Sequence, residues 1–271
     1  MLSFNASTVD REALGKITEP YQILPGGRSV FQAKDVATFV ACDNANVLIH
    51  SSYITRPWKE DISNVTRINL RNYAALAKRI GTKDILIHMP SNVQEYDEAA
   101  FGIEAIIEYV INNDCYCHLE TNPMSKELRT KLKVTKETAV KETYDMTEML
   151  LGLVPKKYRD SFFICVDTAH LFANGFDTEH MIEYIEKYKP IIKYIHFNGN
   201  KNPMFTSDKH VPMYRSDNKI DDADKLTSYC SKIKKILIAE DSTEKGTYDE
   251  WKRYCEKYGI GIVAYDDVYS I

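Results

Sequence analysis

Short apolar runs alternate with longer amphipathic stretches along most of this chain. The runs have strand composition and lie near residues 2–6, 20–24, 46–50, 84–88, 115–120, 162–167, 192–196 and 236–240. Helical periodicity lies near 8–16, 32–41, 61–80, 96–112, 136–152, 178–188, 221–232 and 245–258. Regular strand–helix alternation is typical of a parallel sheet with crossover helices. The pattern therefore predicts an α/β fold, a TIM (β/α)8 barrel with eight parallel strands and outer helices.

The length fits one such barrel, because eight βα units need about 250 residues and the chain has 271. No Pro/Ser-rich linker divides it, so we expect a single domain over 1–271. The longest irregular stretch is about 197–220. Long loops inside compact domains are usually functional, which makes this stretch a candidate part of the site.

Six of the apolar runs end on a histidine or a carboxylate. They read NVLIH to His50, DILIH to His88, CYCHLE to Glu120, FFICVD to Asp167, IKYIH to His196 and KILIAE to Glu240. A parallel barrel gathers its strand C-termini around one pocket. CVDTAH adds His170 three residues after Asp167, and SDKH adds Asp208 and His210 in the long loop. We therefore interpret these nine residues as one metal site.

Taken singly, each residue has an ordinary explanation. A histidine at a strand end is more often a hydrogen-bonded core residue than a ligand, and Glu240 suits the cap of a following helix. Six strand ends would need six separate explanations, however, and five of the seven histidines fall into the set. Of the other two, His118 shares a strand face with Glu120 and is expected in the barrel interior or behind a ligand. His180 is expected to be solvated.

Imidazole and carboxylate ligands together suit zinc, and also manganese or iron. The composition is compatible with such a metal site, because hydrophobic residues make up 44% and charged residues 27%, as in ordinary globular proteins. Six scattered cysteines do not resemble a disulfide framework, which favours a reducing compartment. We see no secretory signal and no bilayer-spanning stretch. The net charge is −4, but three divalent cations would bring it to −4 + 6 = +2, so nucleic-acid partners stay open.

Several segments resemble the endonuclease IV family of apurinic/apyrimidinic endonucleases, within the xylose isomerase-like TIM-barrel superfamily. They are HSSY (50–53), LIHMP (86–90), LET (119–121), CVDTAHLFANGFD (165–177), HFN (196–198) and DKH (208–210). The resemblance implies three Zn²⁺ ions, with Mn²⁺ in part of the site. By that resemblance, one ion is held by His50, His88 and Glu120. A second shares Glu120 with Asp167, His196 and Glu240, and the third is held by His170, Asp208 and His210.

The activity implied by the resemblance is base-excision repair of DNA. The phosphodiester 5′ to an abasic site is hydrolysed, with metal-bound hydroxide as nucleophile and Glu120 as the catalytic bridging ligand. Arg28, in the loop PGGR, and Tyr53 would be inserted at the damaged site. We expect an intracellular monomer, in the cytoplasm or nucleus, that binds double-stranded DNA and no membrane. Lys201 and Lys209 lie where they can reach phosphates, and Trp58 either lines the cleft or packs.

Three segments depart from the family pattern. The chain has Asn198-Gly199 where the family usually has Asn-Asp, VPMYRSD where it has a glycine-rich turn, and FNAS where it has His-Val-Ser. These loops frame the substrate and carry none of the nine ligands. Two rivals stay open: a metal-dependent sugar isomerase or epimerase of the same superfamily, and a non-catalytic DNA- or metal-binding protein. The trio His170, Asp208 and His210 argues against the isomerase, which typically needs one or two metals.

Overall fold

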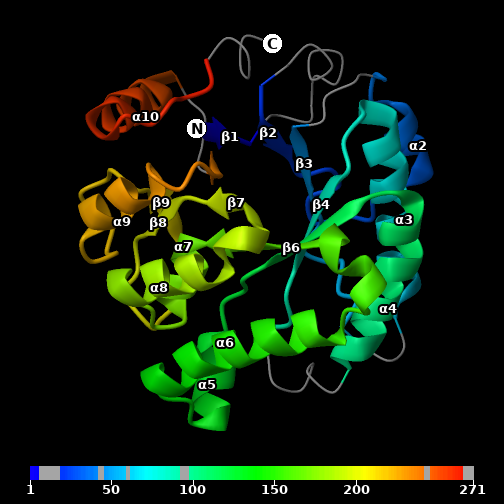
Figure 1. The fold of residues 1–271 in the computed structure, drawn as a ribbon, viewed down its shortest axis with the longest axis horizontal. Helices are drawn as coiled ribbons and strands as arrows, with labels where there is room; N and C mark the ends of the chain where they lie inside the picture. Colours follow the sequence, from blue (N-terminus) through cyan, green and yellow to red (C-terminus); the bar gives the residue numbers. More distant parts are fainter. Residues whose placement is uncertain (6–18, 42–45, 59–61, 92–97, 241–244, 265–271) are drawn as a thin grey trace. The chain divides into compact units, whose positions relative to one another are not determined.

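The computed structural model describes residues 1–5, 19–41, 46–58, 62–91, 98–240 and 245–264. The chain forms two compact units. Figure 1 shows its ribbon coloured along the sequence. Unit 1 comprises 1–5, 121–147 and 164–265, and unit 2 comprises 6–120, 148–163 and 266–271. The short helix expected at 8–16 lies outside the described residues. The single domain expected over 1–271 stays a prediction.

The eight predicted strands are confirmed. They are β1 (Leu2–Phe4), β2 (Tyr21–Ile23), β3 (Val47–His50), β4 (Asp84–His88), β5 (Tyr116–Glu120), β6 (Phe162–Asp167), β7 (Ile192–His196) and β10 (Ile236–Ala239). They follow one another in the order β1-β10-β7-β6-β5-β4-β3-β2. Pairs such as Leu2 opposite Leu237 and His88 opposite Glu120 are parallel. The predicted α/β class with an eight-stranded parallel sheet is therefore correct.

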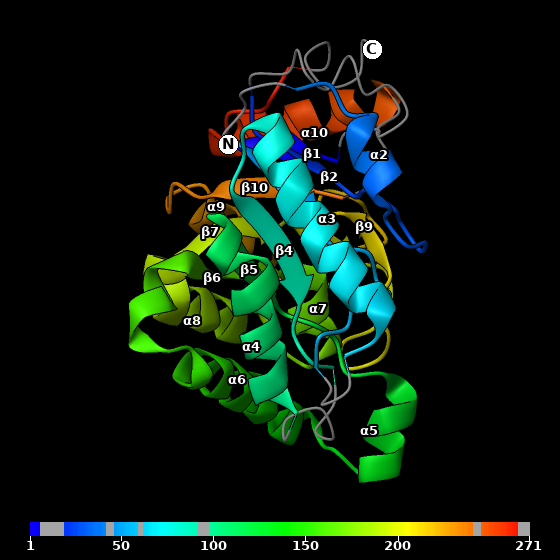
Figure 2. The same cartoon turned by 90° about the vertical axis from the view of Figure 1, so that its right-hand side faces the viewer.

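Unit 2 places helices beside β2, β3, β4 and β5 (Figure 2). They are α2 (Ala33–Ala37), α3 (Asn64–Ile80) and α4 (Ala99–Tyr109), with 3-10 turns η2 (Ile111–Asn113) and η3 (Lys156–Ser161). Helix α3 begins three residues later than predicted, because the Ser63 side chain accepts a hydrogen bond from Thr66 N and caps it. It ends at Gly81, whose φ of 78° is left-handed. The strands are buried along almost their whole length, as expected for a sheet covered on both faces.

Unit 1 carries β1, β7 and β10, the end of β6, and a two-stranded antiparallel ribbon of β8 (Asn198–Asn200) and β9 (His210–Pro212). Its helices are α5 (Lys126–Leu132), α7 (Thr168–Ala173), α8 (Thr178–Tyr188), α9 (Ala223–Cys230) and α10 (Lys245–Tyr258), with the turn η4 (Lys189–Ile191). Helix α6 (Lys136–Leu153) begins in this unit. Sequence periodicity does not predict α5, α7 or the ribbon, which are all short.

The described cysteines are buried, and none of them is in a disulfide. Burial raises the pKa of the Cys115 thiol to about 12, and it also raises the pKa of Cys117. Both side chains are buried, at 3% and 0% exposure. Cys42 lies outside the described residues. Among the described helices, none combines the length and the apolar character that a membrane crossing requires.

Candidate metal centre

In unit 2, three predicted ligands stand at the ends of adjacent strands: His50 ends β3, His88 ends β4 and Glu120 ends β5. The Nε2 atoms of His50 and His88 lie 3.4 and 3.2 Å from the same oxygen, Glu120 Oε2. The two imidazole rings are 5.0 Å apart between centroids. His50 and Glu120 are buried. Strand register thus brings two imidazoles to one carboxylate oxygen.

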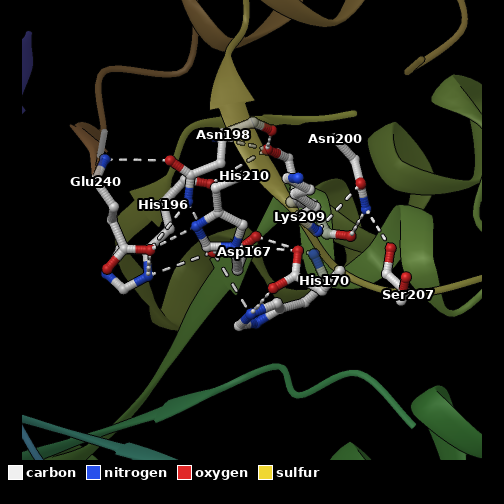
Figure 3. A network of polar contacts seen from close by, with 12 residues as sticks. Asp167, His170, His196, Asn198, Asn200, Ser207, Lys209, His210 and Glu240 are labelled. Atoms are coloured by element: carbon white, nitrogen blue, oxygen red, sulfur yellow. Dashed lines mark hydrogen bonds and ion pairs between the residues drawn. The ribbon is translucent and has the colours of Figure 1, made fainter. Parts of the chain in front are cut away.

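Unit 1 brings the other six predicted ligands together. Figure 3 labels Asp167, His170, His196, His210 and Glu240. Asp167 ends β6, His196 ends β7, and Glu240 directly follows β10. His196 Nδ1 lies 3.6 Å from Asp167 Oδ2 and 3.4 Å from Glu240 Oε2. The long loop and its ribbon supply Asp208 and His210.

His210 lies between these two carboxylates and Asp208. Its Nε2 is 3.6 Å from Asp167 Oδ2 and 3.2 Å from Asp208 Oδ1, and its Nδ1 is 3.5 Å from Glu240 Oε2. His170 Nε2, from α7, is 3.5 Å from Asp208 Oδ2. The donor atoms of Asp167, His170 and His210 are close enough together to hold one ion.

These separations fit metal ligands better than hydrogen bonds. Zinc with ligands at about 2.0–2.1 Å in a tetrahedron sets neighbouring donor atoms about 3.3–3.5 Å apart. The imidazole–carboxylate distances above run from 3.2 to 3.6 Å. The two remaining histidines behave differently, because His118 lies 2.8 Å from Asp84 and His180 lies 2.7 Å from Asp177. Those are hydrogen-bond lengths.

Two further observations favour bound cations. The buried atoms Asp208 Oδ1 and His210 Nε2 form no hydrogen bond within the described residues, although they face each other. In addition, Nδ1 of His50 lies 2.7 Å from the Ser51 carbonyl, and Nδ1 of His170 lies 2.7 Å from the Thr121 carbonyl. An imidazole that donates its Nδ1–H to a carbonyl presents the lone pair of Nε2 to a metal. In both residues Nε2 is the atom that faces the carboxylate.

The electrostatics of unit 1 is dominated by carboxylates. Burial raises the pKa of the Asp167 carboxyl, but His170, His210 and His196 outweigh burial and hold that pKa below its usual value. Asp208 behaves likewise, because His170 and His210 keep its pKa low against burial. Burial lowers the pKa of His210, yet the carboxylates around it raise it to about 9. The pocket therefore attracts positive charge strongly.

Asp167 is fixed by three separate contacts. Its Oδ1 accepts the His170 N–H at 2.9 Å and so caps α7. Its own N–H donates to Thr121 Oγ1 at 2.9 Å. Its Oδ2 accepts from Asn198 Nδ2 at 2.9 Å. Sequence reasoning missed Thr121 and Asn198 as supporting residues, although both adjoin predicted ligands within the LET and HFN segments.

His118 and Trp58 have packing roles. His118 shares a strand face with Glu120, as expected, but its Nε2 contacts Asp84 at the start of β4 and its ring stacks on Phe163 at 5.1 Å. Trp58 is 3% exposed and donates its indole N–H to the His88 carbonyl at 2.8 Å. Of its two expected roles, packing fits this position.

The two residues expected to contact DNA lie in neighbouring loops of unit 2. Arg28 is exposed and follows Gly26 and Gly27, which have φ of 85° and 52°. Ser52, directly before Tyr53, donates its hydroxyl to the Gly27 carbonyl at 2.5 Å. Tyr53 is 51% exposed, and its ring lies 5.4 Å from that of His88. In unit 1, Lys209 is exposed, whereas Lys201 forms an ion pair with Asp217 at 3.4 Å.

No family model and no curated protein matches the sequence. Solved structures do match its fold. A D-tagatose 3-epimerase-like protein aligns with 95% of this chain and 98% of its own, at TM-score 0.65 and 15% identity. Endonuclease IV from Thermus thermophilus aligns over 95% and 98%, at TM-score 0.62 and 16% identity. A xylose isomerase domain protein from Planctomyces limnophilus aligns over 100% and 98%, at TM-score 0.62 and 13% identity.

These similarities define the fold: the chain has the TIM-barrel fold of the matched structures. The fold expected from the sequence is therefore confirmed. The His and carboxylate groups of each unit are of the types that bind metal ions. The matched structures carry the names of both an endonuclease and sugar-converting proteins. At 13–16% identity they show the fold and do not assign an activity.

Proposed function

We propose that the chain is a metal-dependent endonuclease that hydrolyses the DNA phosphodiester 5′ to abasic sites. The proposal rests on the number of donors. Unit 1 alone gathers three imidazoles and three carboxylates, whereas a single tetrahedral zinc takes four ligands. The residues concerned are Asp167, His170, His196, Asp208, His210 and Glu240. More than one ion is therefore needed to use them, which favours a multinuclear phosphodiesterase.

The full proposal assigns three Zn²⁺ ions to the nine ligands, with Mn²⁺ an alternative in part of the site. In a TIM barrel the C-terminal ends of the strands surround one pocket. On that general ground, we propose that Glu120 is the catalytic ligand that bridges two ions together with the unit 1 carboxylates. Bound divalent cations would supply hydroxide at neutral pH and neutralise the scissile phosphate. The nine side chains themselves hold and space the cations, and the buried carboxylates keep the pocket negative.

Arg28 and Tyr53 are the proposed contacts to damaged double-stranded DNA, bound by a monomer. The exposed guanidinium and the exposed phenol project from loops joined by the Ser52–Gly27 hydrogen bond. A missing base lowers the cost of opening the stack, so an aromatic ring and a cation are suited to fill and hold the gap. Lys209 is a further candidate for phosphate contact.

The alternative is a metal-dependent sugar isomerase or epimerase of the same superfamily. One preparation can separate the two. The purified chain is incubated with a duplex carrying a single abasic analogue, with and without chelator, and in parallel with a panel of aldoses and ketoses followed by NMR. We expect chelator-sensitive incision 5′ to the lesion and no sugar conversion. Sugar conversion without incision would overturn the proposal.

A matched pair of histidine variants links incision to the site. His170→Ala removes a proposed ligand, whereas His180→Ala removes an exposed histidine that hydrogen-bonds Asp177 outside the site. We expect incision to fall strongly in His170→Ala and to be unchanged in His180→Ala. Equal activity in the two variants contradicts the multinuclear interpretation.

A further inference from the structure

Asn198 stands between two of the proposed ligand carboxylates. Its Nδ2 donates to Asp167 Oδ2 at 2.9 Å and to Glu240 Oε2 at 3.0 Å, and its Oδ1 accepts the Glu240 N–H at 3.1 Å (Figure 3). The side chain is fully buried. One amide therefore contacts the last residue of β6 and the residue that follows β10.

The oxygens that Asn198 holds are also the oxygens that face the imidazoles. Asp167 Oδ2 and Glu240 Oε2 lie 3.6 and 3.4 Å from His196 Nδ1. A carboxylate oxygen has two lone pairs, so it can accept from the amide with one and face a cation with the other. The amide thus sets the direction in which each carboxylate presents its second lone pair.

A neutral donor suits this position. Two carboxylates that share a site repel each other, and two N–H donors offset that repulsion. A lysine or arginine would do so too, but its charge would also repel an incoming cation. The primary amide has two hydrogens for two acceptors, and it leaves the negative charge of the pocket unchanged.

The backbone of Asn198 is held as well. Its N–H donates to Thr168 Oγ1 at 3.0 Å, and the Thr168 hydroxyl donates to the Asn198 carbonyl at 2.5 Å. Thr168 directly follows Asp167 and is fully buried. The residue that orients Asp167 is therefore locked to the residue next to Asp167, so the amide has little freedom to turn away.

We propose that Asn198 is a positioning residue that pre-sets Asp167 and Glu240 for metal ions. The inference rests on the metal site of the proposed function, but not on its DNA substrate. Loss of a hydrogen-bonding partner behind a ligand typically lowers metal affinity by about 10–100-fold. Asn198→Leu preserves side-chain size and removes both donors, so we expect zinc to be released faster by about that factor.

The matched control is Asn69→Leu. Asn69 is also fully buried, accepts the Phe31 N–H at 2.8 Å and donates to Thr55 Oγ1 at 2.9 Å, all within unit 2. Each zinc-loaded protein is mixed with excess chelator well below its melting temperature, and zinc release is followed with a colorimetric indicator. If Asn198 has only a structural role, both variants should have a lower melting temperature and both should release zinc at the wild-type rate.

We expect fast release from Asn198→Leu and the wild-type rate from Asn69→Leu. Wild-type release from Asn198→Leu, or equal acceleration in both variants, overturns the role of Asn198. A wild-type chain that retains no zinc overturns the metal site itself, and thus the inference. If Asn198→Leu does not fold, Thr168→Val replaces it, because it loosens the Asn198 backbone and is expected to accelerate release by a smaller factor.

Discussion

Gly102→Ala tests whether Trp58 braces the end of β4. A Cβ at Gly102, inside α4, would lie 2.7 Å from Trp58 Cζ3 and would also overlap Trp58 Cε3. Trp58 is 3% exposed and donates to the His88 carbonyl, so its ring has little room to retreat without breaking that bond. The added methyl group should therefore disturb both the packing and the strand end that presents His88.

The expected loss follows from three contributions. Overpacking a core typically costs about 1–3 kcal/mol, and loss of the indole hydrogen bond adds about 0.5–1.5 kcal/mol. Replacing a glycine inside a helix by alanine raises the free energy of unfolding by about 0.5–1 kcal/mol and so offsets part of this loss. The net decrease in the free energy of unfolding is roughly 2 kcal/mol, the sum of these central values. It should appear as a lower urea midpoint at unchanged slope.

Gly152→Ala is the matched control, because Gly152 lies in α6 and a methyl group there would have no atom within 4 Å among the described residues. That substitution should raise stability by up to about 1 kcal/mol. Adding Trp58→Phe should reduce the cost of Gly102→Ala, since the smaller ring leaves space for the methyl group. If Gly102→Ala is as stable as Gly152→Ala, the proposed brace does not exist.

The other predictions concern the ligands and the DNA contacts. Metal analysis of the purified chain should approach three ions per chain, mainly zinc, and full activity with one ion would favour the isomerase instead. Glu120→Ala should lose more metal and more incision than His118→Ala, because Glu120 is proposed to bridge two ions whereas His118 bonds Asp84 and stacks on Phe163; equal losses would show that the bridging ligand is misassigned. Arg28→Ala should retain all metals while incision of an abasic duplex falls, and unchanged cleavage across salt concentrations would make Arg28 an ordinary surface residue.

Much of this fold is predictable because each strand is a compact apolar run with a polar end. The run FFICVD indicates both the bounds of β6 and the position of Asp167. Helix ends are less predictable, because they depend on single caps. Ser63 delays the start of α3, and Asp35, whose side chain accepts the Gln32 N–H, sets the start of α2, which spans only five residues of a longer amphipathic stretch.

The supporting contacts could not be predicted from periodicity. Asn198 is 31 residues from Asp167 and 42 from Glu240, and it meets both only because β6, β7 and β10 are neighbours. The β8–β9 ribbon depends on Asn218, whose Oδ1 accepts the Asn200 and Ile220 N–H groups. A Cβ at Gly199 would lie 2.7 Å from Asn218 Cγ. The Gly that departs from the family pattern therefore makes room for this asparagine.

The double use of Asp167 constrains how this position can change. One oxygen caps the N-terminus of α7, and the other faces His196 and His210. A neutral Asn at 167 could keep the cap with its oxygen. Its amide N–H groups would then point at the amide N–H groups of Asn198, so two donors would face each other. A Glu side chain is one methylene longer, so its carboxylate could still face the imidazoles but would no longer cap α7. The residue at position 167 must both cap α7 and face the imidazoles. Asp208 lies in an irregular loop and has chiefly the second role. Substitutions that retune the centre gradually should therefore accumulate at 208 long before they are tolerated at 167.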